Sequence, residues 1–106
     1  MTLRDAQNLC VKNSRMINER LDPQRGKGWT PFAMVTGLLE EAGEVASAVR
    51  GLEGFKPAEK PKTKEMLATE LSDLLYMIFI LAEHYGIELE EPFVQTINGY
   101  LSRFIK

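Results

Sequence analysis

Apolar residues recur along most of this chain at the three- and four-residue intervals of amphipathic helices, and no segment shows the strict alternation of a strand. The first helix is predicted to begin with Thr2 as its N-cap and to run to about Leu21. Its apolar stripe contains Leu3, Cys10, Ile17 and Leu21. Cys10 is therefore expected to be a core thiol.

The second helix has the clearest start in the sequence. Thr30 offers a capping hydroxyl, and Pro31 follows at the first helical position, where proline is favoured. The apolar spacing continues to about Arg50, and Gly51 is predicted to end the helix. A broad apolar arc on this helix predicts ordinary core, and its members are Met34, Val35, Leu38, Leu39, Ala42, Val45, Ala46 and Val49.

Two further helices follow a second break in the pattern. Thr63 caps the third helix, which is predicted to continue to Tyr85 and to end at Gly86. Glu91 and Pro92 open the fourth. One face of the fourth helix is apolar and carries Phe93, Ile97, Tyr100, Leu101 and Phe104.

Segments 22–28 and 51–62 separate the helices and are predicted to be loops, because glycine, proline and charged residues dominate them. The sequence therefore predicts an all-α fold, with a four-helix bundle-like protomer. A chain of 106 residues is long enough for one hydrophobic core and too short for two. Residues 1–106 are expected to form a single domain.

The composition narrows the class of protein. The 13 basic and 15 acidic residues are interspersed, which gives a net charge of -2 and no basic face for nucleic acid. The single cysteine excludes an internal disulfide, and no Cys/His cluster indicates zinc. The longest apolar run, 74–82, has nine residues, less than half a membrane span, and no signal-peptide stretch opens the chain. We expect a cytoplasmic protein that binds neither nucleic acid nor membrane.

The candidate chemistry begins with Glu70, which occupies a position where a helix normally carries an apolar residue. On a helical wheel, Glu70 falls between Met66 and Met77 on one side and Leu74 and Leu81 on the other. Burying an unpaired carboxylate is costly. This side chain must therefore be neutralised, paired or bound to a metal.

A second stripe on the second helix has small residues at its ends and acidic residues in its middle. It consists of Gly37, Glu41, Glu44 and Ala48. The small ends let another backbone approach closely, so the stripe is expected to face a helix. Its two glutamates share one face, and Glu70 and Asp73 do the same on the third helix. Two such pairs on facing helices would present four carboxylates to one pocket. Oxygen ligands of this kind suit Mg²⁺ or Mn²⁺.

Other interpretations of the acids stay open at this stage. Glu40 fits a solvated surface position, and Glu70 could be the partner of a buried lysine or arginine. A di-iron or di-manganese carboxylate bundle is disfavoured, since that design needs a histidine three residues after a glutamate and none stands there. A catalytically inactive helical interaction module is the remaining alternative, supported by the apolar half of the third helix.

The acids also follow a recognisable order. The chain reads Glu40-Glu41-x-x-Glu44, then 25 intervening residues, then Glu70-x-x-Asp73, with leucine pairs before the first block and after the second. This arrangement resembles the signature of the MazG-like all-α nucleoside triphosphate pyrophosphohydrolases. The resemblance covers roughly residues 29–103.

The resemblance implies a fold that assembles as a dimer or tetramer and a Mg²⁺-dependent enzyme of nucleotide-pool house-cleaning. The implied reaction cleaves a nucleoside triphosphate between its α- and β-phosphates and yields the monophosphate and pyrophosphate. The implied metal ligands are Glu41, Glu44, Glu70 and Asp73. Glu40 would orient a ligand or a water. A related dUTPase or phosphoribosyl-ATP pyrophosphohydrolase is an alternative, and the base and sugar preference stays open.

The resemblance also bears on the residues that would bind the phosphates. Arg103 matches an arginine that family members place near the phosphates on the last helix. A lysine is common one turn earlier in relatives, but Gly99 stands there in this chain. Lys56, Lys62 or Lys64, before or at the start of the third helix, could replace it.

Aromatic residues and the single histidine have two interpretations each. Trp29 precedes the cap of the second helix, where a hydrophobic staple packs, and it could instead stack on a nucleobase. Phe32 and Phe55 could stack similarly. His84, near the end of the third helix, fits packing or helix-dipole stabilisation better than catalysis. The glycines at 26 and 28 do not form a phosphate-binding P-loop.

The third helix also predicts self-association. Segment 76–81 is apolar on every side of the helix, and Phe79 and Ile80 are predicted to point away from the stripe of Glu70. So short a chain has little left to cover these two side chains, and a large exposed apolar patch marks a protein contact. Together with the resemblance, this pattern predicts a homodimer or homotetramer.

Overall fold

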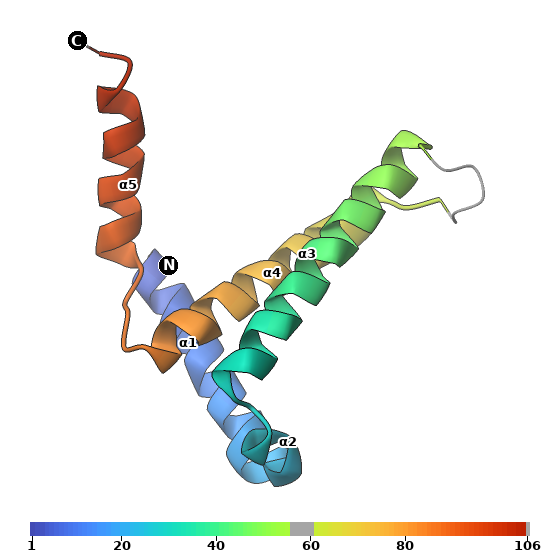
Figure 1. Ribbon diagram of the computed structural model, residues 1–106, viewed down its shortest axis with the longest axis vertical. Helices are drawn as coiled ribbons and strands as arrows, with labels where there is room; N and C mark the ends of the chain where they lie inside the picture. Colours follow the sequence, from blue (N-terminus) through green and yellow to red (C-terminus); the bar gives the residue numbers. More distant parts are fainter. Residues whose placement is uncertain (56–60, 106) are drawn as a thin grey trace.

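The computed structural model describes residues 1–55 and 61–105, and these residues form helices and no strand, which confirms the all-α prediction for them. Figure 1 shows their arrangement. The elements in chain order are α1 (Leu3–Met16), the π-helix η1 (Ile17–Leu21), α2 (Pro23–Lys27), α3 (Pro31–Glu53), α4 (Lys64–His84) and α5 (Glu90–Ser102). None of the described helices is long and apolar enough to cross a membrane.

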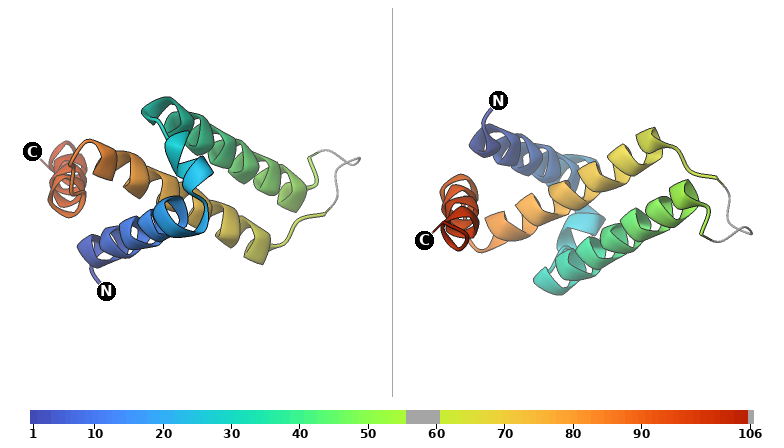
Figure 2. Two further views of the ribbon diagram at one scale, coloured as in Figure 1. Left: turned by 90° about the horizontal axis from the view of Figure 1, so that it is seen from below. Right: turned by 90° about the horizontal axis from the view of Figure 1, so that it is seen from above.

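The centre of the fold is an antiparallel pair formed by α3 and α4, with α1 lying against α4 (Figures 1 and 2). Each of these three helices gives one side chain to the core cluster, namely Val11, Met34 and Ile80. Cys10 packs against this cluster, and burial raises the pKa of its thiol, as the predicted core position requires.

The predicted helix starts at the three threonines are confirmed. The hydroxyls of Thr2, Thr30 and Thr63 each accept a hydrogen bond from the backbone N–H three residues later. At Thr2 the Asp5 carboxylate also accepts from the Thr2 backbone N–H, which completes a capping box. These caps are local in sequence, which is why the pattern alone predicted them.

Two helix ends differ from the prediction. α3 does not stop at Gly51 but continues to Glu53, and Gly54 ends it with a left-handed φ of 64°. The first helix changes to a π-helix after Met16, and Leu21 is then 71% exposed. A π turn holds more residues than an α turn, so the apolar stripe predicted with α-helical spacing no longer faces the core there.

The segment predicted as a loop over 22–28 contains the short helix α2, so the predicted count of four helices is wrong. The carboxylate of Asp22 accepts a hydrogen bond from the backbone N–H of Arg25, and Pro23 occupies the first helical position. In the other predicted loop, residues 56–60 lie outside the described residues.

The residues expected to be uncovered on α4 are buried within the single chain. Phe79 is 1% exposed and Ile80 is 5% exposed. Ile80 meets Val11 of α1 in the core, and Phe79 lines a cavity together with Cys10 of α1. The prediction that these two side chains need a second subunit is wrong, because α1 packs on the side of α4 that the sequence left open.

Exposed apolar surface lies elsewhere. On α3, side chains of the arc predicted to be core reach the surface, including Val35, Leu39 and Val49. α5 makes no extensive contact with another described helix and projects away from the α3–α4 pair (Figure 1). Its predicted apolar face is exposed along its whole length, and the residues are Phe93, Ile97, Tyr100, Leu101 and Phe104.

One buried glutamine joins α1 to the turn before α5. Gln7 is 2% exposed, and its Nε2 donates a hydrogen bond of 2.8 Å to the carbonyl oxygen of Ile87. Its Oε1 accepts a hydrogen bond of 2.9 Å from the backbone N–H of Leu89. Arg4, one turn earlier on α1, forms ion pairs with Glu88 and Glu90. The start of α5 is thereby fixed to α1.

Candidate metal centre

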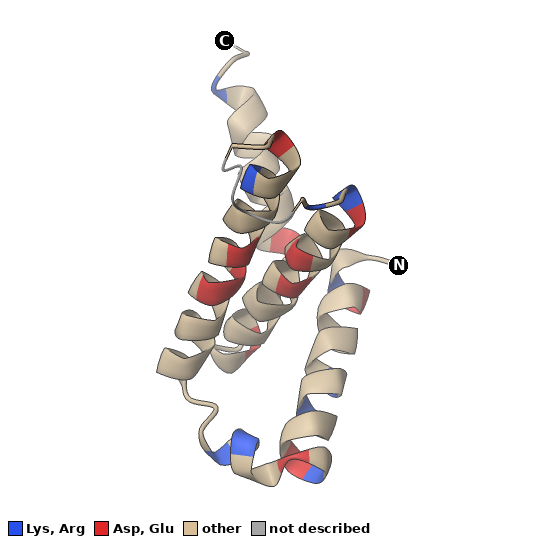
Figure 3. Ribbon diagram, turned by 90° about the vertical axis from the view of Figure 1, so that its right-hand side faces the viewer, with Lys and Arg blue, Asp and Glu red and all other residues tan. Residues whose placement is uncertain are grey.

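The small-residue stripe of α3 faces α4, as predicted. The two helices are close at Gly37, where an added Cβ atom would lie 2.9 Å from the Met77 methyl group. Ala48, three turns further along α3, is 2% exposed. Because both ends of the stripe lie against α4, the acidic residues between them lie at the junction of the two helices. Figure 3 shows acidic positions of α3 and α4 at the same level.

Three carboxylates converge at this junction. Glu41 from α3 and Glu70 and Asp73 from α4 each offer an oxygen atom, and these three oxygens lie within 4.8 Å of one another. Two ligands on opposite sides of a Mg²⁺ ion are about 4.2 Å apart, since each bond is about 2.1 Å long. The spacing of the trio is therefore close to that of ligands around one small cation.

The electrostatics of the trio are those of repelling like charges. Burial is the main cause that raises the pKa of Glu41, and the charges of Asp73, Glu70, Glu44 and Glu40 raise it further, in that order. Glu41 and Glu70 are partly buried, and Asp73 is exposed. A cation placed among them would remove this repulsion.

Within residues 1–55 and 61–105, the structure gives Glu70 no ion-pair partner. Two arginines of α1 form ion pairs elsewhere, Arg4 with the turn before α5 and Arg15 with Glu83. Carboxylates without a basic partner, gathered from two helices, are a donor set that suits a hard divalent cation. The residues present therefore fit a metal such as Mg²⁺.

The other two predicted acids lie beside the trio and are not part of it. Glu44 is exposed, and it lines a cavity of about 150 Å³ together with Glu70 and Lys62. Glu40 is exposed at the edge of the same helix face. Lys62, one of the lysines considered for a phosphate contact, is thus the basic residue of this cavity.

The remaining predicted substrate contacts have mixed outcomes. Arg103 follows the last turn of α5 with its guanidinium 5.4 Å from the ring centroid of Tyr100, and α5 stands apart from the trio (Figure 1). Lys56 lies outside the described residues. His84 is exposed in the last turn of α4 and stacks edge-on against Tyr85, so it does not join the trio.

Trp29 packs against the core cluster, which confirms the hydrophobic-packing interpretation. The Arg25 guanidinium lies 5.1 Å from the centroid of its ring. One face of the indole is therefore covered by a cation. A nucleobase could not stack on this face without displacing Arg25.

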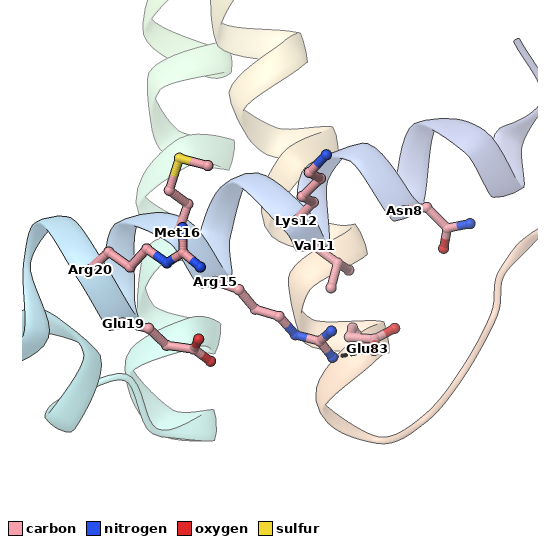
Figure 4. A pocket seen from close by; sticks show the side chains of 8 residues that line it. All are labelled: Asn8, Val11, Lys12, Arg15, Met16, Glu19, Arg20 and Glu83. Carbon is pink, nitrogen blue, oxygen red and sulfur yellow. Dashed lines mark hydrogen bonds and ion pairs between the residues drawn. The ribbon is translucent and has the colours of Figure 1, made fainter.

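A cavity of about 450 Å³ lies away from the carboxylates, beside α1 and η1 (Figure 4). Its charged lining is mostly basic, with Lys12, Arg15 and Arg20. Arg15 reaches across to Glu83 of α4, with 3.4 Å between Nη2 and Oε1. A smaller cavity adjoins it on the side of Trp29 and shares Arg15 and Glu83 as lining residues.

That smaller cavity is lined by a residue that the sequence pattern did not single out, Asn18 of η1. Its Nδ2 donates a hydrogen bond of 3.3 Å to the Ser14 hydroxyl. Two polar residues four apart in a predicted apolar stripe were the available signal. Asn18 and Trp29 both line this cavity.

Comparison with known proteins identifies the family. The chain matches the MazG nucleotide pyrophosphohydrolase domain over residues 29–104. It is 40% identical over 74 residues to the uncharacterized protein YvdC of Bacillus subtilis (strain 168). This alignment covers 61% of this chain and 70% of that protein. It is 31% identical over 75 residues to the uncharacterized protein YpjD of the same organism. This alignment covers 71% of this chain and 68% of that protein. No solved structure matches the chain. The chain therefore belongs to the MazG nucleotide pyrophosphohydrolase domain family.

Proposed function

We propose that this protein is a Mg²⁺-dependent nucleoside triphosphate pyrophosphohydrolase that releases a nucleoside monophosphate and pyrophosphate. The observation that carries the proposal is the convergence of the Glu41, Glu70 and Asp73 carboxylates within 4.8 Å in a domain of the MazG family. Mn²⁺ is an alternative cation, because it takes the same oxygen ligands.

In this proposal the acidic residues have different roles. Glu41, Glu70 and Asp73 hold the cation, and Glu44 completes the ligand set from the next turn of α3. The chemistry that a bound Mg²⁺ supplies at such a site is neutralisation of phosphate charge and activation of water. Glu40 orients the water that attacks the α-phosphorus. The bond from the α-phosphorus to the bridging oxygen breaks, and pyrophosphate leaves with that oxygen.

Basic residues would balance the remaining phosphate charge. The position of Lys62 in the cavity with Glu44 and Glu70 supports this role for it. Arg103 and Lys56 are further candidates from the family resemblance. Because α5 stands apart from the trio, Arg103 would act at the carboxylates of a neighbouring copy.

An assembly follows from the same proposal. The apolar face of α5 and the exposed side chains of α3 are large surfaces that a second copy of the chain would cover. We therefore propose a homodimer or homotetramer as the active form. Within each copy, α1 gives Val11 to the core shared with α3 and α4, so residues 1–106 would act as one domain.

The proposal is tested by incubating the protein with Mg²⁺ and a panel of canonical and modified nucleoside triphosphates and separating the products. We expect the monophosphate and pyrophosphate from at least one nucleotide. Orthophosphate as the product, or no hydrolysis across the panel, would contradict the proposal.

A matched pair of variants tests the assignment of the carboxylates. Glu70→Gln should lower activity at least about a hundredfold, because loss of even an outer-shell metal partner costs 10- to 100-fold. Its Mg²⁺ affinity, measured by calorimetry, should fall while the metal-free fold is retained. Glu65→Gln, an exposed position in the first turn of the same helix, should leave both unchanged. Unfolding of Glu70→Gln with unaltered metal affinity would make Glu70 a structural residue.

A further inference from the structure

The cavity of about 450 Å³ beside α1 and η1 has no role in the proposed reaction (Figure 4). None of the three converging carboxylates lines it. Its charged lining consists of three cations, Lys12, Arg15 and Arg20, and two acids, Glu19 and Glu83. The cavity is thus a region of net positive charge in a chain whose formal net charge is -2.

The three cations are only weakly engaged by the protein itself. Within residues 1–55 and 61–105, the structure gives Lys12 and Arg20 no ion-pair partner. Arg15 forms one ion pair, in which its Nη2 lies 3.4 Å from Oε1 of Glu83. A strong arginine–carboxylate pair is shorter and uses two parallel hydrogen bonds. Arg15 can therefore exchange Glu83 for a ligand that Lys12 and Arg20 also contact.

The π-helix η1 accounts for the presence of Arg20 in this lining. Arg15 and Arg20 are five residues apart, so on a continuous α-helix their side chains would point about 140° apart. In η1 the Asp22 N–H donates to the carbonyl oxygen of Ile17, five residues earlier, at 2.6 Å. This wider turn allows both arginines to line one cavity. π turns are rare and are frequent at functional sites, and this one leaves Leu21 71% exposed.

The cavity is separate from the metal centre. Glu83 follows Asp73 by ten residues on α4, which is about 15 Å along the helix axis. Ten residues also rotate the helix by about 1,000°, so these two side chains point about 80° apart. A small anion in the cavity therefore lies outside the carboxylate trio.

We propose that this cavity is a second anion site, which binds a phosphate-bearing anion without a metal ion. Arginine offers a planar fork of donors and lysine a compact charge, and both are common ligands of phosphate oxygens. An anion with one charge would gain little over the Glu83 carboxylate that already contacts Arg15. A group with two or more charges would pair with Lys12 and Arg20 as well. The proposal does not depend on the hydrolysis of any nucleotide.

Calorimetry in the presence of EDTA tests the proposal, because no divalent cation is then available to hold phosphate at the acidic trio. The first probe is inorganic pyrophosphate. We expect one ion to bind per chain, with an affinity that falls as the salt concentration rises. The second probe, ADP, distinguishes the source of the phosphate: equal affinity assigns recognition to the phosphates alone, and tighter binding assigns the site to a nucleotide. Absence of binding for both probes would overturn the proposal.

Charge-matched variants separate this site from general attraction to basic side chains. Lys12→Gln and Arg20→Gln should each weaken pyrophosphate binding about tenfold, the effect of losing one hydrogen bond to a charged group. Lys27→Gln removes the same charge from an exposed position of α2 outside the cavity, so it should leave the affinity unchanged. An equal loss in Lys27→Gln and Lys12→Gln would indicate adventitious binding only and would overturn the proposal.

Two acid-to-amide variants locate the bound ion. Glu83→Gln removes the competitor of the ligand at Arg15, so it should strengthen pyrophosphate binding about threefold, in keeping with the small contribution of an exposed ion pair. Glu70→Gln should leave the affinity unchanged, because the trio lies farther from the cavity than the screening length of about 10 Å at 0.1 M salt. An effect of Glu70→Gln with none of Glu83→Gln would place the ion at the metal centre and overturn the proposal.

Discussion

The α3–α4 pair and α5 both have regular apolar patterns in the sequence, but apolar residues are buried in the first and the apolar face is exposed in the second. α3 and α4 bury small and apolar residues against each other and bring three carboxylates together. α5 carries an equally regular apolar face that no described helix covers. The periodicity of a helix thus predicts which face is apolar, whereas the partner of that face depends on contacts far away in sequence or in another chain.

The largest expected contrast is between two phenylalanines, Phe79 of α4 and Phe93 of α5. Phe79 is 1% exposed, so Phe79→Ala should lower the free energy of unfolding by about 3–5 kcal/mol. Phe93 is 52% exposed, so Phe93→Ala should change it by less than about 0.5 kcal/mol at a concentration where only single chains are present. Urea denaturation measures both, and a similar loss for the two variants would mean that α5 packs on its own chain.

The second expected effect concerns assembly. Ile97→Glu or Leu101→Glu would place a charge on the apolar face of α5, and each apolar side chain buried at an interface contributes about 1.5–3 kcal/mol. The protein should then sediment as a 12.0 kDa single chain with reduced activity. Gln95→Glu, on the opposite face of α5, is the matched control. A wild-type protein that is fully active at 12.0 kDa would show that α5 needs no partner.

The smallest expected effect is a pH dependence centred on Glu41. Its pKa is raised in the folded state, so the metal-free protein should lose stability as the pH rises through that pKa and the carboxylate becomes charged. Glu41→Gln should remove this loss and add about 0.5 kcal/mol at pH 7. Glu40→Gln should add less, because Glu40 contributes least to the shift. Thermal unfolding from pH 4 to 8 without Mg²⁺ measures the trend, and stability that increases over this range would contradict it.

The sequence predicted those features that depend on neighbours along the chain. Thr30 and Thr63 cap their helices because the bonded N–H lies three residues away. The acidic pairs share a face because the helical repeat places them there. The convergence of Glu41 with Glu70 and Asp73 also required a close approach of α3 and α4, for which Gly37 and Ala48 were the visible sign.

What the sequence did not predict depends on non-local packing. Phe79 and Ile80 are covered by α1, and the direction in which α1 crosses α4 has no local signature. Leu21 reaches the surface because a π-helix interrupts the α-helical repeat. Both Gly51 and Gly54 could end α3 by sequence, but only Gly54 adopts the left-handed φ that ends the helix.

The buried Gln7 has a consequence for amide hydrogen exchange. The first N–H groups of a helix lack partners within the helix and normally exchange quickly. At the start of α5, however, the Leu89 N–H donates to the Oε1 of a side chain that is 2% exposed. Its deuterium uptake therefore reports separation of α5 from α1, distinct from fraying of α5 itself. One backbone amide can thus be used to follow the anchoring of the whole C-terminal helix.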